Sequence, residues 1–335
     1  MTNQNARRLD LPVDNPFHPE LHTGDVAFMQ PRLQSLEFTT SNAVRDALAE
    51  TGRTEDVRFS PDNRWLVLAG YGLQHLLVLS VRVQKGPTGT VVLADDFMKL
   101  KSDGITSAHG VDFIDGRTLA VANRDGYVSI IEIPSGALAG RCQEVGPVCE
   151  ITGGRFSKMN SPGSIAVRHQ NGGKVSLLVC NNYIHRVTQH VVDPARGFQV
   201  KSNSVLLERS LNVPDGIAVS RDGRWIAVSN HVTHEILIFD DRWLLGRYSR
   251  PVGVLTGTAF PHGLRFTPDD RHLLVADAGS PVINVYQRGS GWAGTRGPLR
   301  TTTVLDHDTF QRGRANPAEG GPKGLDIDRS GAVVA

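Results

Sequence analysis

The sequence predicts an all-β fold, a single six-bladed β-propeller with four-stranded antiparallel blades. Three observations predict it: a unit of roughly fifty residues recurs along most of the 335-residue chain, glycine is frequent with 35 residues, and stretches with helical periodicity are nearly absent. Tight turns between short strands account for the glycines. A propeller also reconciles this length with one domain, because each blade packs on its neighbours and no central core has to grow.

The clearest copy of the unit runs from Pro214 to Asp240. It contains three short apolar runs separated by turn residues, at Ile217–Ser220, Trp225–Ser229 and Glu235–Phe239. A fourth apolar run follows the third in most copies, for example Val252–Thr256. The first strands of the copies begin at Asp56, Gly110, Ser164, Gly216, Gly263 and Gly324, spaced by 54, 54, 52, 47 and 61 residues. Six copies predict six blades.

The repeats divide the chain into an N-terminal arm, residues 1–54, and a propeller, residues 55–335, with blades that start near 55, 109, 163, 215, 262 and 323. In the arm we expect a short helix at Ser41–Glu50 capped by Ser41, and two candidate closing strands, Val26–Met29 and Leu36–Thr40. The last copy stops within its second strand. We therefore expect an incomplete sixth blade and a chain truncated at its C-terminus.

Composition and missing motifs exclude several classes of function. The formal net charge is only +2, and basic and acidic residues are interspersed, which argues against nucleic acid or an acidic membrane as a partner. No apolar run is long enough for a signal peptide or a membrane span, so a cytoplasmic protein is expected. The motifs G-x-S-x-G, H-E-x-x-H and the phosphate-binding glycine loops are absent, which argues against a serine hydrolase, a zincin and a nucleotide cofactor.

One mouth of the predicted channel collects polar residues, because it receives the start of each first strand. The residues at these positions are Glu55, His109, Gly163, Asp215, His262 and Lys323. Carboxylates neutralise the charge of a divalent ion, and imidazoles add nitrogen ligands. Glu55, His109, Asp215 and His262 are thus candidate ligands of one metal ion, with Zn²⁺, Mn²⁺ or Fe²⁺ favoured over the oxygen-preferring Ca²⁺.

The residues after each second strand form a second polar ring at the same mouth: Asn123, Asn181, Asn230 and Asp277. We expect them to be substrate-facing groups, with strand-end turn caps as the alternative. A purely structural alternative also applies to the inner ring. Lys323 and Glu55 belong to neighbouring blades and could form an ion pair, while His109 and Asp215 could bond to the backbone of the next blade.

The segments PDGIAVSRDGRWIAVSN, Pro214–Asn230, and PHGLRFTPDDRHLLVAD, Pro261–Asp277, resemble the repeats of six-bladed propellers of the NHL, YVTN and gluconolactonase/strictosidine-synthase-like superfamily. The resemblance covers about residues 55–335 and implies the fold rather than one activity. Gluconolactonase-like enzymes hold a metal at this mouth with Glu, Asn and Asp, and Glu55 and Asp215 look like two of these ligands. His262 instead looks like a zinc histidine of amidating-lyase propellers.

Two functions of different classes follow from these patterns. The first is a propeller that binds a small molecule or a protein at its mouth, with one divalent ion and lactonase-like hydrolysis as its chemistry. The second is a non-catalytic protein-interaction scaffold. Nothing in the inner ring selects a substrate.

Overall fold

The computed structural model describes residue 34 and residues 36–86, 89–314 and 316–335. The chain divides into two units, Met1–Gln34 and Ser35–Ala335, and the fold described below is that of the second. The expected closing strand Val26–Met29 lies outside the described residues. Within the described part of the chain, no helix has the length and apolarity needed to cross a membrane.

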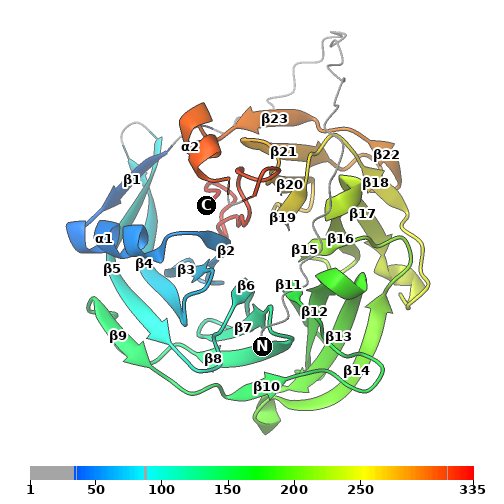
Figure 1. Ribbon diagram of the computed structural model, residues 1–335, viewed down its shortest axis with the longest axis horizontal. Coiled ribbons are helices and arrows are strands. Elements are labelled where there is room, and N and C mark those ends of the chain that lie inside the picture. Colours follow the sequence, from blue (N-terminus) through cyan, green and yellow to red (C-terminus); the bar gives the residue numbers. More distant parts are fainter. Residues whose placement is uncertain (1–33, 35, 87–88, 315) are drawn as a thin grey trace, which may run out of the picture. The chain divides into compact units, whose positions relative to one another are not determined.

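The second unit consists of β-sheets whose innermost strands surround a common centre (Figure 1). The first sheet contains β2 (Thr54–Phe59), β3 (Trp65–Gly70), β4 (His75–Gly86) and β5 (Gly89–Lys101). The second contains β6 (Ala108–Phe113), β7 (Thr118–Asn123), β8 (Tyr127–Glu132) and β10 (Cys149–Ile151). The third contains β11 (Pro162–His169), β12 (Val175–Asn181), β13 (Arg186–Asp193) and β14 (Gln199–Leu207). The fourth contains β15 (Pro214–Val219), β16 (Trp225–Asn230), β17 (Glu235–Asp240) and β18 (Gly253–Leu255). The fifth contains β19 (Pro261–Phe266), β20 (His272–Asp277), β21 (Val282–Gln287) and β23 (Arg300–Thr303).

These successive strands pair antiparallel within each sheet, which confirms the prediction of an all-β propeller. Three short strands add parallel to outer edges: β1 (Glu37–Thr40) and β9 (Arg141–Glu144) to β5, and β22 (Gly294–Arg296) to β18. The outer strands of the first and fourth sheets are thereby covered by short segments from elsewhere in the chain, which shields these two edges.

The blade count differs from the prediction, because the described residues form five sheets rather than six. The sixth repeat, Lys323–Ala335, forms one isolated antiparallel bridge between Ile327 and Val334. Among the described residues, the sixth repeat therefore adds no multi-stranded sheet. The segment nevertheless occupies the space beside the first sheet, since a Cβ on Gly324 would touch the backbone of Asp56.

Helix α1 (Asn42–Thr51) covers the outer half of the first sheet on the side of the sixth repeat. Ser41 caps it by accepting a hydrogen bond from the backbone of Val44 at 3.2 Å. Val44, Ala47 and the sixth repeat's Val333 are buried in one cluster with β4 and β5. A helix and a short hairpin therefore bury the apolar face that a complete sixth blade would otherwise cover.

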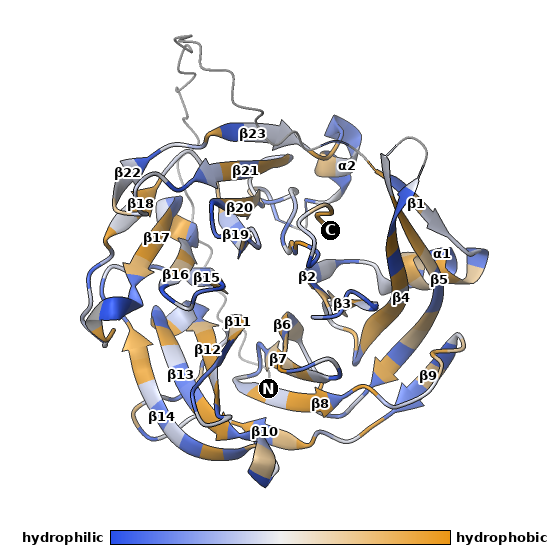
Figure 2. Cartoon of the chain, turned by 180° about the vertical axis from the view of Figure 1, so that it is seen from behind, coloured by the Kyte–Doolittle hydropathy of each residue, from blue (hydrophilic) through white to orange (hydrophobic). Residues whose placement is uncertain are grey.

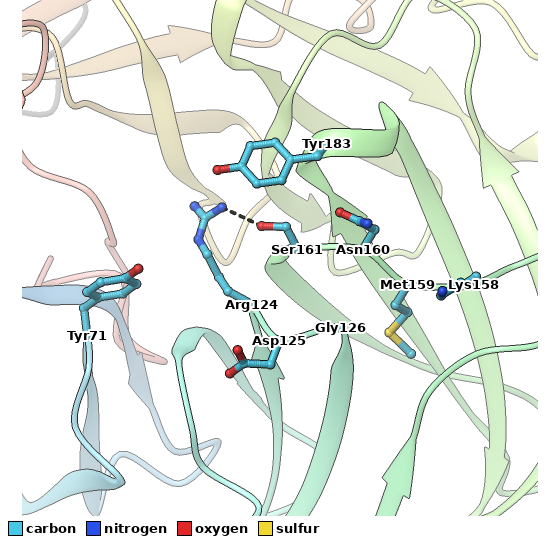
Figure 3. Close-up of a pocket in the computed structure, with 9 residues that line it drawn as sticks. All are labelled: Tyr71, Arg124, Asp125, Gly126, Lys158, Met159, Asn160, Ser161 and Tyr183. Carbon is cyan, nitrogen blue, oxygen red and sulfur yellow. Dashed lines mark hydrogen bonds between the residues drawn. The ribbon is translucent and has the colours of Figure 1, made fainter. Parts of the chain in front are cut away.

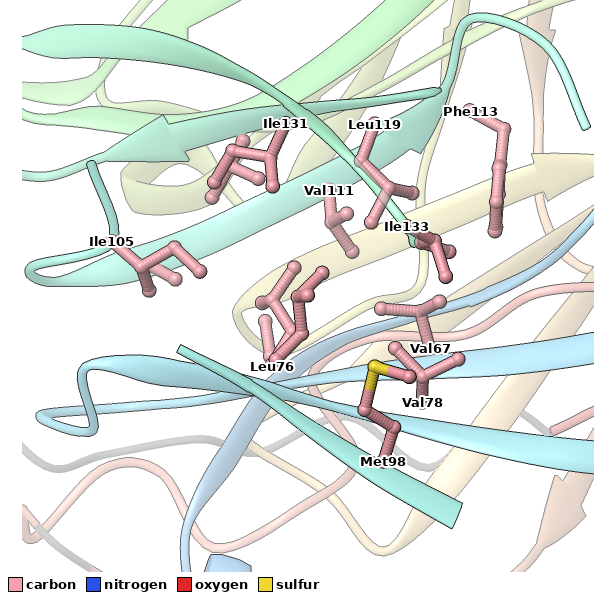
Figure 4. Close-up of a cluster of buried hydrophobic side chains, with 14 of the residues drawn as sticks. Val67, Leu76, Val78, Met98, Ile105, Val111, Phe113, Leu119, Ile131 and Ile133 are labelled. Atoms are coloured by element: carbon pink, nitrogen blue, oxygen red, sulfur yellow. The ribbon is translucent and has the colours of Figure 1, made fainter. Parts of the chain in front are cut away.

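The hydrophobic core is divided into layers between neighbouring sheets. Figure 2 shows apolar residues concentrated along the strands. Figure 4 shows one such layer, in which Val67 and Leu76 of the first sheet face Val111, Leu119 and Ile131 of the second, all of them fully buried. Burying each such side chain contributes roughly 1.5–3 kcal/mol. Four such layers join neighbouring sheets and hold the inner strands in a defined register around the centre.

Buried aspartates also link neighbouring inner strands. Each accepts a hydrogen bond from a backbone N–H of the next strand: Asp56 from Val111 (3.0 Å), Asp112 from Val167 (2.8 Å) and Asp326 from Phe59 (2.8 Å). The Asp326 bond joins the sixth repeat to β2 and so closes the ring. Arg265 of β19 donates to Asp326 at 3.0 Å, which fixes the same carboxylate from the other side.

Candidate functional site

The inner strands share a local irregularity that turns one side chain out of the ladder. The pairing register between first and second strands shifts between Thr54 and Asp56, Ala108 and Gly110, Pro162 and Ser164, Pro214 and Ile217, and Pro261 and Leu264. A bulge of this kind re-aims side chains and often lies next to an active site. The residues it affects include Glu55, His109, Asp215 and His262, which are all at most 4% exposed.

A glycine follows three of these four residues because adjacent inner strands approach each other closely. At Gly216, for example, a Cβ would overlap the carbonyl oxygen of His262 on the next strand. The close approach brings the side chains just before the glycines toward one point. The motif P-[DH]-G is therefore a requirement of packing at the centre as well as a carrier of polar side chains.

Three of the four predicted ligands converge. One ligand atom each from Glu55, His109 and His262 lies within 4.8 Å of the other two. Glu55 Oε2 is 3.2 Å from His109 Nε2 and 4.0 Å from His262 Nε2. Tetrahedral ligation by nitrogen and oxygen at 2.0–2.2 Å separates ligand atoms by about 3.4 Å, so these spacings suit one ion. Asp215 is not in this group, but its Oδ2 is 3.1 Å from His262 Nε2.

The hydrogen bonds of His109 fix its tautomer. Its Nδ1 is 2.6 Å from the carbonyl oxygen of Gly163, which can only accept, and its Nε2 is 2.6 Å from Arg124, which can only donate. The proton of the neutral ring is therefore on Nδ1, and Nε2, which accepts from Arg124, also lies 3.2 Å from Glu55 Oε2. A ligand histidine held by a backbone carbonyl at its other nitrogen has this arrangement.

Several polar atoms of the cluster have no hydrogen-bond partner among the described residues. They are both carboxylate oxygens of Glu55, His262 Nε2 and Asn182 Oδ1. Unpaired buried polar atoms are costly, and most buried groups in proteins are satisfied. Glu55 Oε2 faces the nitrogen acceptors His109 Nε2 and His262 Nε2. Such an arrangement of acceptors is favourable only if a positive charge or a hydrogen-bond donor lies close to them.

Cationic side chains surround the carboxylates. Arg53 Nε is 2.6 Å from Glu55 Oε1, and Lys323 Nζ is 3.5 Å from Glu55 Oε2. The ion pair between Lys323 and Glu55 that the sequence offered as a structural alternative is thus present, alongside the cluster of ligand atoms. Arg124 lies 3.7 Å from Asp215 Oδ1. The cluster therefore combines two acidic groups with three permanent positive charges at its edge.

Glu55, Asp215 and His262 have the ionisation states of metal ligands at neutral pH. Burial lowers the pKa of His262 to about 3 despite the nearby Asp215, so the ring is neutral. Burial alone would raise the pKa of Asp215, but the surrounding imidazoles, His262 first, and the permanent positive charge of Arg124 hold it well below its usual range. Burial likewise opposes ionisation of Glu55, yet His109 and Lys323 lower its pKa to about 2. Ligation by carboxylates and imidazoles requires these deprotonated forms.

Asn182 takes the place that the inner ring leaves empty at Gly163. A Cβ on Gly163 would overlap Asn182 Oδ1, so the missing side chain provides space for this amide. Asn182 Nδ2 donates to Asp215 Oδ1 at 2.7 Å and holds that carboxylate in position. In the sequence, this arrangement is indicated only by Gly163, a glycine at a position where the other repeats have a polar residue.

His231 and Glu319 are further members of the site that the sequence did not indicate. His231 Nε2 is 3.2 Å from Glu319 Oε1 and its Nδ1 is 3.8 Å from Asp215 Oδ2, while Lys323 donates to Glu319 at 2.7 Å. Glu319 lies in the long segment between the fifth and sixth repeats, after helix α2 (His307–Arg312). Its tertiary placement, rather than any motif, brings it to the mouth.

The second polar ring is used within the scaffold. Asn123, Asn181, Asn230 and Asp277 are at most 2% exposed. In each, a side-chain oxygen accepts a hydrogen bond from the loop before its own blade's inner strand, the donors being the backbone N–H groups of Thr106 (3.1 Å), Asn160 (2.9 Å), Asn212 (2.6 Å) and Ala259 (2.8 Å). These bonds match the turn-cap alternative, and the substrate-facing role expected for these residues stays a prediction. Their polar atoms hold the loops in which the mouth is built.

A pocket of about 460 Å³ lies beside the cluster, and Arg124 belongs to both (Figure 3). Arg124 extends between Tyr71 and Tyr183, and donates to Ser161 Oγ at 3.0 Å. Lys158 lines the pocket and is exposed. Asp125 is the pocket's carboxylate, and Thr106 donates to it at 2.5 Å. With two cations and one anion, the pocket favours an anionic group.

Comparison with known proteins supports a propeller fold. A family model described as lactonase, 7-bladed beta-propeller, matches residues 183–303, about a third of the chain. This stretch includes Asp215 and His262 but neither Glu55 nor His109, and the family's seven blades differ from the five sheets seen here. No curated protein matches the sequence.

Solved structures of similar shape are distant in sequence. Kuenenia stuttgartiensis hydrazine synthase matches with a TM-score of 0.50 at 14% identity, over 84% of this chain and 72% of that one. A putative 6-phosphogluconolactonase from Bacteroides fragilis matches with a TM-score of 0.49 at 12% identity, over 84% and 75%. A functionally unknown protein from Desulfotomaculum acetoxidans gives 0.48 at 12%, over 75% and 69%. At such identities, the hydrazine synthase match shows the fold alone.

Proposed function

We propose that this protein hydrolyses lactones or related esters with one divalent ion, zinc, manganese or iron, bound by Glu55, His109 and His262. The observation that carries the proposal is the convergence of three buried ligand atoms: Glu55 Oε2 lies 3.2 Å from His109 Nε2 and 4.0 Å from His262 Nε2. A cation between these atoms would bind all three. The partial match to a lactonase family model supports the choice of reaction class.

The donor set fits such an ion in number and type. One carboxylate and two imidazoles make three protein ligands, as catalytic zinc sites have, and leave a position for water or substrate. An ion bound there would polarise a carbonyl oxygen and make bound water a stronger acid. Asp215 Oδ2 lies 3.1 Å from His262 Nε2, so a second carboxylate would add negative charge beside the ion.

The neighbouring pocket fits the product of the reaction. Attack of water on a lactone forms a C–O bond, breaks the ring ester bond and gives a hydroxy acid, whose carboxylate is new negative charge. Arg124 and Lys158 supply positive charge in the pocket next to the cluster. A small molecule at the mouth, without nucleic acid or membrane, is therefore the partner that we propose, and the cytoplasmic location stays a prediction.

The test is metal content together with turnover. Purified protein is analysed for transition metals, stripped with a chelator, and reloaded with Zn²⁺, Mn²⁺ or Ca²⁺ while its melting temperature and its hydrolysis of a panel of γ- and δ-lactones are measured. We expect one transition metal per chain, a higher melting temperature on reloading, and turnover that requires the ion.

A matched pair of variants separates the site from general effects. His109→Gln removes a ligand, whereas His272→Gln alters a histidine at the far end of β20, which runs from His272 to the mouth residue Asp277. We expect metal binding and turnover to be lost in the first variant only. Absence of bound metal and of turnover in the wild-type protein would overturn the proposal and favour the protein-interaction scaffold.

A further inference from the structure

Arg124 contacts the candidate metal centre at the atom that a metal would need. Its Nη2 donates to His109 Nε2 at 2.6 Å, while its Nη1 donates to Ser161 Oγ at 3.0 Å in the pocket. The guanidinium is about one-fifth exposed, so it lies at the boundary between the buried cluster and the open pocket. Arg124 is therefore the physical link between the two.

The contact at His109 excludes simultaneous ligation. A neutral imidazole has one ring lone pair, and Nδ1 of His109 is committed to the Gly163 carbonyl as a donor. The lone pair on Nε2 can accept from Arg124 or bind an ion, but it cannot do both. A positive guanidinium 2.6 Å from this atom also repels a cation.

Arg124 has other acceptors within reach. Ser161 Oγ already accepts from it, and Asp215 Oδ1 is 3.7 Å away. Figure 3 shows the guanidinium between the rings of Tyr71 and Tyr183, facing the pocket. An anion in the pocket would offer the guanidinium a charge-assisted partner that a neutral imidazole cannot match.

We propose that Arg124 and a divalent ion compete for His109 Nε2, and that an anion in the adjacent pocket strengthens ion binding by holding Arg124 away from that atom. This inference rests on the proposed function, since it assumes that the cluster binds an ion. Coupling of this kind is reciprocal: the ion frees Arg124 for the anion, and the anion frees His109 for the ion. Arg124 is thus a positioning residue that makes the metal centre sensitive to what occupies the pocket.

The first experiment measures Zn²⁺ affinity by isothermal titration calorimetry at fixed pH, with chelator-stripped protein. We compare wild type, Arg124→Met and Arg53→Met. Arg53 pairs with Glu55 Oε1 at 2.6 Å, so its replacement also removes one positive charge beside the cluster without touching His109. We expect Arg124→Met to bind Zn²⁺ about tenfold more tightly than wild type, because no charged hydrogen bond has to be broken, and Arg53→Met to show a smaller change.

The second experiment repeats the titrations in sodium sulfate and in sodium chloride of equal ionic strength. Sulfate is expected to tighten Zn²⁺ binding to wild type several-fold and to leave Arg124→Met unchanged. Equal affinities of Arg124→Met and Arg53→Met, or a sulfate effect that persists in Arg124→Met, would overturn the inference while leaving the metal site standing. If neither wild type nor Arg124→Met binds Zn²⁺, the proposed function itself fails.

Discussion

Asn123 provides a direct test of whether the second polar ring belongs to the scaffold or to a substrate site. Its side chain is fully buried; its Oδ1 accepts from the Thr106 N–H at 3.1 Å, and its Nδ2 donates to the Gly104 carbonyl at 3.0 Å. Asn123→Ala removes both bonds and leaves two backbone groups in the loop without partners. At roughly 1–2 kcal/mol for each group, we expect the free energy of unfolding to fall by about 2–4 kcal/mol.

The assay is urea denaturation of Asn123→Ala against wild type at pH 7, with Asn171→Ala as the matched control, since Asn171 is exposed in a turn. The control is expected to change stability by less than about 0.5 kcal/mol. A loss below about 1 kcal/mol in Asn123→Ala would refute the scaffold role. The refutation would be stronger still if the variant raised KM for a lactone at unchanged stability.

Two further predictions concern the inner strands. Burial raises the pKa of Asp326 to about 6, although the nearby Arg58 opposes this shift. The neutral carboxyl therefore contributes its full share to the free energy of unfolding below about pH 4. This contribution is lost as pH rises through 6. Asp326→Asn stays neutral, although it gives up one of the two oxygens that accept from Phe59 and Arg265. Its stability difference from wild type should therefore shift in favour of the variant between pH 4 and 7, by up to about 3 kcal/mol. Asp328 and Arg265 also face this carboxylate, and a constant difference in urea midpoint across this range would contradict the assignment. Gly216→Ala should lower both stability and Zn²⁺ affinity, because its Cβ would overlap the carbonyl of His262, and an unchanged Zn²⁺ titration in this variant would show that the close approach does not position the ligand.

The repeat pattern predicts much of the fold, because turns, strand lengths and the inner-strand glycines are all local features of the sequence. The start of each inner strand can be found in the sequence, and so the convergence of Glu55, His109 and His262 could be anticipated. Ser41 as the cap of α1 was equally local. What these features share is that residues close in sequence determine them.

The remaining parts depend on contacts that sequence spacing does not encode. Asn182 enters the site because Gly163 leaves a space, and Glu319 enters because a long loop folds back over the mouth. The sixth repeat matches the pattern but forms one isolated bridge, and α1 covers the adjacent face of the first sheet. Asn123 and its equivalents were ambiguous, since Asn suits both a turn cap and a substrate contact.

The central claim is that one divalent ion binds between Glu55, His109 and His262. Anomalous diffraction from crystals of the Zn²⁺-loaded protein, collected on both sides of the zinc absorption edge, tests it most directly. We expect a single strong peak within about 2.0–2.2 Å of one oxygen of Glu55 and of Nε2 of both histidines, with Arg124 displaced from His109. A peak elsewhere, or no peak at this position in fully loaded crystals, would contradict it.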